Sequence, residues 1–154
     1  MNRSSSEELN AKYRTAVWIE TAVFFITLLL VLAAWLLPPN RSVYVGSDLM
    51  PIWVLVLFMA AASFVVRRMF IRWDRLRDQK LLYGTSGLLK FMVRNTLILS
   101  LFALAISIAG FVSSMLSGDR FDSLRSAAVA VIVLALNFPR RKIWKRIVED
   151  LSEE

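Results

Sequence analysis

Glu20 is the acidic residue that lies deepest in an apolar stretch of this 154-residue sequence. In a helix it would lie about 10 Å beyond Tyr13, the residue at the edge of that stretch. An ionisable group is costly in such surroundings, and where it occurs it commonly lines an ion path or pairs with a cation. The alternative is that Glu20 reaches back to the polar edge or pairs with an arginine such as Arg94. Glu20 is therefore the first candidate for chemistry.

A second candidate is a face of small and weakly polar residues in the apolar stretch 96–116. Spacings of three and four place these residues on one side of a helix: Ser100, Ala103, Ser107, Gly110 and Ser114. Small residues let helix backbones approach closely, so this face predicts a packing seam, within one bundle or between subunits, continued by Ala127 and Ala130. The alternative is a polar path created by oligomerisation and lined by Glu20, Ser100, Ser107 and Ser114.

The sequence contains neither cysteine nor histidine. This composition removes the usual ligands of zinc, haem and copper, the commonest general base, and every nucleophilic dyad that depends on imidazole. An enzyme acting on lipid would need paired acids or a basic nucleophile near the membrane boundary, and Asp119 with Asp122 is the only nearby pair of acids. We therefore expect no catalytic residues, no cofactor, no bound metal and no enzymatic activity.

The elements that must position these residues are apolar helices. Hydrophobic residues make up 57 % of the chain, which is more than the core of a soluble domain of this size needs. They fall into four blocks, each close to the length of about 17–25 residues that spans a bilayer as a helix: 15–37, 49–66, 96–116 and 121–138. The pattern predicts an all-α polytopic membrane protein with four transmembrane helices and short outer loops at 38–48 and 117–120.

The orientation of these helices follows from the distribution of lysine and arginine. The segments 1–14, 67–95 and 139–154 carry all but three of the nineteen Lys and Arg residues. Cytoplasmic loops of membrane proteins carry such an excess, so we expect both termini and the middle connection to lie in the cytoplasm. The layout resembles that of small bacterial pore-forming and phage-exclusion membrane proteins. We therefore expect the protein in the bacterial cytoplasmic (inner) membrane.

The cytoplasmic segments are predicted to be helical extensions of the spans. No glycine or proline occurs from Ile52 to Tyr83, so the second span is expected to continue as one protruding helix into a basic helical hairpin over 67–95. In the tail, Ile143, Ile147 and Leu151 recur every four residues, which predicts an amphipathic helix. Its apolar stripe would lie on the membrane surface or pack on the protruding face of Met69, Trp73 and Leu76.

The two halves of the chain resemble each other. Each has an arginine before a span, a short outer loop, a second span and then an Arg-Arg pair, which is Arg67-Arg68 in one half and Arg140-Arg141 in the other. A duplicated hairpin, inserted the same way up twice, would produce this pattern, although selection for positive cytoplasmic loops produces much of it alone.

The basic cytoplasmic residues suggest anionic lipid headgroups or an acidic partner, and no stacking aromatics accompany them to suggest nucleic acid. The candidates are Arg67, Arg68, Arg72, Arg75, Arg140, Arg141 and Lys142. Two functions remain open, and the sequence favours the first, because only a few polar groups could line an ion path. The first is a non-catalytic membrane protein that assembles with itself or as an accessory subunit of a larger membrane complex. The second is a small oligomeric ion channel or transport protein that uses Glu20.

Overall fold

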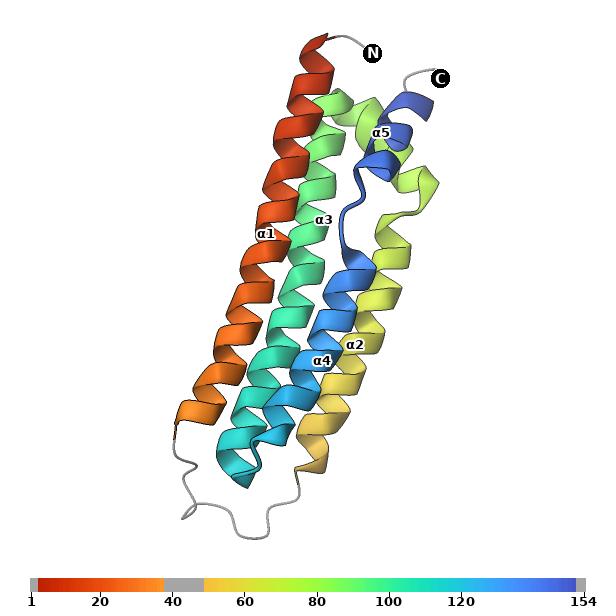
Figure 1. Ribbon diagram of the computed structural model, residues 1–154. Coiled ribbons are helices and arrows are strands. Elements are labelled where there is room, and N and C mark those ends of the chain that lie inside the picture. The colour runs from red at the N-terminus through yellow and green to blue at the C-terminus, as the bar shows by residue number, and fades with distance from the viewer. Residues whose placement is uncertain (1–2, 38–48, 152–154) are drawn as a thin grey trace.

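The computed structural model describes residues 3–37 and 49–151, and each regular element in these ranges is a helix. The helices are α1 (Arg3–Leu36), α2 (Met50–Phe70), α3 (Trp73–Ser117), α4 (Phe121–Asn137) and α5 (Arg141–Asp150). Figure 1 shows α1 to α4 side by side in an elongated bundle, with α5 and the start of α3 at the end where both termini lie. The predicted outer loop 38–48 and the last three residues lie outside the described ranges.

Among the described residues, four helices are long and apolar enough to cross a membrane, which confirms the prediction of an all-α fold with four such segments. The predicted blocks fall on α1, α2, the second half of α3, and α4. With 17 residues, α4 is about 25 Å long, close to the minimum for a span.

A short turn joins α3 to α4 within the predicted loop 117–120. Gly118 has a φ of +73°, which glycine adopts at little cost, and its N–H donates to the Ser114 carbonyl at 3.0 Å. The Asp119 side chain then accepts the N–H of Phe121 at 2.9 Å, at the start of α4. These contacts end one helix and begin the next, so α3 and α4 form an antiparallel pair.

The prediction of one continuous helix from Ile52 to Tyr83 is wrong. The helix α2 ends at Phe70, and Arg72 has the extended backbone angles φ −62° and ψ 127° before α3 begins. This break is not caused by glycine or proline. The break turns the chain, and Leu76 is buried in the resulting arrangement. A second bend occurs at Gly84, where φ is +68°. As Figure 1 shows, the first part of α3 therefore lies across the end of the bundle.

That end of the bundle has its own apolar core, which we call the end cluster. It comprises Leu9, Ala16, Leu76, Leu88, Leu89, Phe91, Met92, Trp144, Ile147, Val148 and Leu151. The Trp144 ring packs edge-on against Tyr13, with ring centroids 5.9 Å apart. The tail helix α5 contacts α1 and shares the end cluster with Leu76, whereas Met69 and Trp73, the other residues of the face predicted to receive it, stay exposed.

Helix α3 is the central element of the bundle and packs on α1, α2 and α4. A second core cluster joins these helices through Val23, Val56, Ala103, Ile106, Ala130, Val133 and Leu134. Only Val56 and Ser63 of α2 are buried, so α2 is the most peripheral helix. The two predicted hairpins are packed differently, because α3 and α4 form a close pair whereas α1 and α2 each pack mainly on α3.

Candidate functional site

Glu20 faces the interior of the bundle and is 2 % exposed. It belongs to a face of α1 that repeats every seven residues, with Thr27 and Ala34 also fully buried. The hydroxyl of Ser100, a buried residue of α3, donates to the Thr96 carbonyl at 2.9 Å. Among the described residues, no donor in hydrogen-bond geometry reaches either carboxylate oxygen of Glu20.

Neither alternative proposed for Glu20 is seen in the structure. The side chain does not reach the polar edge, because it is enclosed. Arg94 is exposed and lies over the Phe91 ring, 5.5 Å from its centroid. Glu20 instead borders a pocket of about 240 Å³ between α1 and α4, whose other walls are mostly apolar and include Leu134 and Phe138. Glu20 is thus an ionisable residue beside a pocket whose lining is otherwise mostly apolar.

The serine face of α3 meets α1 along one seam. Thr27 and Ser107 are hydrogen bonded across the two helices at 2.9 Å, one heptad beyond Glu20 and Ser100. Because the Ser107 hydroxyl also lies 3.0 Å from the Ala103 carbonyl as a donor, Thr27 is the donor of the interhelical bond. Ser114 lies a further heptad along, fully buried, and its Oγ has no partner in the described part of the chain.

At the α3–α4 turn both acidic side chains are paired. Asp122 is buried, and its Oδ2 accepts hydrogen bonds from Ser113 and Ser117, each at 3.0 Å. Its Oδ1 lies 3.4 Å from Nη1 of Arg125, which is also 3.9 Å from Asp119. Arg125 therefore lies within ion-pair distance of both acids considered for lipid chemistry. Asp122 is held in place by this ion pair and by its two hydrogen bonds from serines.

The small residues of α3 face α4 within the same chain. Gly110 lies against Ser126, and a Cβ built on Gly110 would overlap the Ser126 side chain. Ala103, Ala127 and Ala130 are buried nearby in the same bundle. Ser107 is buried on the same helix as Gly110, so the predicted seam residues Ala103, Ser107, Gly110, Ala127 and Ala130 all lie inside the bundle of this one chain, where close helix packing needs small residues.

The predicted basic residues gather at the end of the bundle that holds the termini. Arg67 is half-buried, whereas the others are exposed: Arg68, Arg72, Arg75, Arg140, Arg141 and Lys142. Arg141 donates to the Asn10 side chain at 2.8 Å. The sequence analysis did not identify Thr27 as a candidate, although its position seven residues after Glu20 is a signal that could have done so. It also did not identify Asn95 and Asn137, which no local pattern distinguishes from other residues.

In the described residues, the fold and the site define a helical bundle with four helices that could cross a membrane and with Glu20, Thr27 and several serines of α3 and α4 buried inside it. In the described ranges, no group of three or more acidic, histidine or cysteine side chains could hold a metal ion. No protein-family model, curated protein or solved structure matches the chain.

Proposed function

We propose that the chain is an integral protein of the bacterial cytoplasmic membrane with four spanning helices and both termini in the cytoplasm. Its side chains are distributed in the reverse of the pattern found in water. Glu20 and Thr27 lie inside the bundle, whereas Trp18, Leu29 and Phe58 are among many large apolar side chains exposed on its outside. Since exposed apolar surface of this extent is unfavourable in water, a lipid environment accounts for it.

The proposed topology predicts opposite accessibility for the two ends of the bundle. The chain has no cysteine, so Asp78→Cys and Arg120→Cys each introduce a single reporter at an exposed position. In intact spheroplasts, a membrane-impermeant thiol reagent should label Arg120→Cys and should label Asp78→Cys only after the membrane is opened. Equal labelling of both variants in intact cells would contradict the topology.

The proposed activity is the non-catalytic binding and transfer of protons or small cations at Glu20. The observation that carries it is the enclosure of both carboxylate oxygens without a hydrogen-bond partner in the described chain. An enclosed, unpartnered carboxylate has a large desolvation penalty. Taking up a proton or a small cation removes that penalty, so this position favours a cation.

Other buried polar groups extend from Glu20 toward the opposite end of the bundle. They are the Thr27–Ser107 pair, then Ser114, and finally Asp122, which pairs with the exposed Arg125. Ser100 and Ser107 are seven residues apart, which is about 10 Å along α3, and the buried residues between them are Ala103 and Ile106. Water must bridge that gap for transfer to occur, because neither side chain can relay a proton or bind a cation.

The test is ion or proton flux through liposomes that contain the purified chain. Glu20→Gln keeps the size of the side chain but removes its charge, and it should reduce flux to the level of empty liposomes. The matched control is Glu7→Gln, the same change at an exposed position of α1, which should leave flux unchanged. Unaltered flux in Glu20→Gln would remove this residue from the mechanism.

Assembly, with a second copy or with a larger membrane complex, is a second candidate. It is favoured by Leu81, Leu82 and Tyr83, three consecutive large side chains that are exposed in the part of α3 outside the predicted spans. The mass of the same purified particle in detergent tests this candidate. More than one chain, or a co-purifying subunit, would support assembly, and a single chain alone would contradict it.

A further inference from the structure

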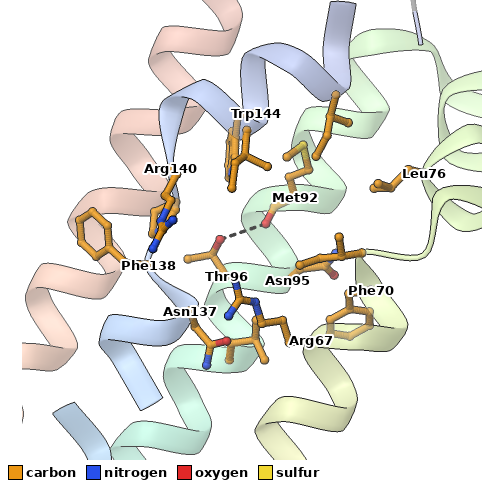
Figure 2. Close-up of a pocket in the computed structure, with 15 residues that line it drawn as sticks. Arg67, Phe70, Leu76, Met92, Asn95, Thr96, Asn137, Phe138, Arg140 and Trp144 are labelled. Carbon is orange, nitrogen blue, oxygen red and sulfur yellow. Dashed lines mark hydrogen bonds between the residues drawn. The ribbon is translucent and has the colours of Figure 1, made fainter. Parts of the chain in front are cut away.

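A pocket of about 90 Å³ lies where the end of α2, the middle of α3 and the α4–α5 connection meet. Figure 2 shows Arg67 of α2, Asn95 and Thr96 of α3, and Asn137 and Arg140 around it. The remaining walls are mainly apolar and include Phe70, Met92, Leu99, Phe138 and Trp144. Two cationic and three neutral polar side chains thus meet in an otherwise apolar enclosure.

The two asparagines bring unused hydrogen-bonding capacity to this pocket. Asn95 is 8 % exposed, and its Oδ1 is enclosed with no partner in the described chain. The Oδ1 of Asn137 is likewise enclosed and has no partner in the described chain. Thr96, in contrast, already donates to the Met92 carbonyl at 3.2 Å. Since buried polar groups are nearly always paired, two enclosed amide oxygens on one pocket indicate a ligand that donates hydrogen bonds.

The two arginines of the pocket favour a negatively charged ligand. Within residues 6–37 and 49–151, neither Arg67 nor Arg140 has a carboxylate partner. Guanidinium groups bind phosphate oxygens through two parallel hydrogen bonds, which makes a phosphate group their best small complement. The ligand that satisfies the whole pocket therefore carries a phosphate together with a hydrogen-bond donor.

We propose that this pocket binds the headgroup of one anionic phospholipid of the phosphatidylglycerol type. Its phosphodiester would lie between Arg67 and Arg140, and its glycerol hydroxyls would donate to Asn95 and Asn137. A zwitterionic headgroup fits less well, because its ammonium would add a positive charge beside two arginines.

The lipid is favoured over free phosphate by the position and the walls of the pocket. Arg67 follows the apolar part of α2, and Arg140 follows the end of α4, so the pocket lies at the depth of the proposed inner-leaflet headgroups. Aromatic and aliphatic walls suit a glycerol backbone and the first part of an acyl chain, which free phosphate lacks. This inference depends on membrane insertion but not on any role of Glu20.

The experiment measures lipid binding to the purified full-length chain in a neutral detergent by native mass spectrometry. Phosphatidylglycerol, phosphatidylcholine and inorganic phosphate are added separately. We expect one phosphatidylglycerol per chain at low lipid concentration, with much weaker binding of phosphatidylcholine. Inorganic phosphate that binds as tightly as the lipid would overturn the assignment to lipid.

Variants distinguish the pocket from general attraction to positive charge. Arg67→Ala with Arg140→Ala should weaken phosphatidylglycerol binding by about tenfold or more, the effect of losing a charge-assisted hydrogen bond. The matched control, Arg68→Ala with Arg75→Ala, removes the same charge from exposed residues outside the pocket and should keep the affinity. Equal loss in both variants would overturn the proposal.

A single uncharged substitution gives an independent measurement. Asn95→Leu removes the enclosed amide without changing net charge, and the rise in Tm that phosphatidylglycerol produces should become smaller in this variant. If Asn95→Leu does not fold, Asn137→Leu provides the same readout, and an unchanged lipid-induced shift in either folded variant would overturn the role of the amides.

Discussion

Gly110→Leu is expected to destabilise the bundle by about 3 kcal/mol or more, or to prevent folding altogether. A Cβ at residue 110 would already overlap the Ser126 side chain and would lie 3.3 Å from the Asp122 carbonyl. Leucine adds three further carbons at a point where the backbones of α3 and α4 are in direct contact. Relief would require separating the two helices, which would break much of the central packing. The measurement is the thermal or denaturant midpoint of the purified protein in detergent.

Two controls isolate the close contact from other effects of the substitution. Ile108→Ala changes an exposed residue on the same helix and should alter the midpoint little. Gly110→Ala should be destabilising by itself and should be partly rescued by Ser126→Gly, which removes the overlapping atoms. If Gly110→Leu melts like the unmodified protein, the α3–α4 contact is not as described here.

Trp144→Ala is expected to cost about 3–5 kcal/mol and to release α5 from the bundle. Trp144 is 5 % exposed and contacts the end cluster and the ring of Tyr13. Because α5 has only 10 residues, it is too short to remain helical once its packing is lost. Protease cleavage after Pro139, and hydrogen exchange in the tail, should both rise strongly.

The matched control for this prediction is Ile143→Ala, one residue earlier on α5. Ile143 is 44 % exposed, so its truncation removes much less buried surface. Protection of the tail should remain close to that of the unmodified chain. Equal release of α5 by both substitutions would show that Trp144 is not its main attachment.

The number and approximate limits of the apolar helices were determined by the sequence. Hydropathy and charge are properties of contiguous residues, so the blocks that became α1, α2, α4 and the second half of α3 are visible without tertiary structure. The same holds for the serine face of α3 and the apolar stripe of α5, which follow from helical periodicity alone.

The tertiary structure decided which faces meet. Along apolar helices both inward and outward side chains are hydrophobic, so the pattern that marks the buried face of a helix in water is largely absent. For this reason the sequence did not reveal that Thr27 pairs with Ser107, or that Gly110 packs on Ser126.

The interruption of the helix at Ile71 and Arg72 also depends on long-range contacts. Neither residue is a helix breaker, and the turn accompanies the burial of Leu76 in the end cluster, which also contains residues of α1 and α5. The same applies to the pocket of Arg67, Asn95, Asn137 and Arg140, which three separate segments build together. The local sequence determines the secondary structure and the hydropathy of each segment. Packing between distant segments determines which side chains share a site, because the packing energy depends on residues that lie far apart in the sequence.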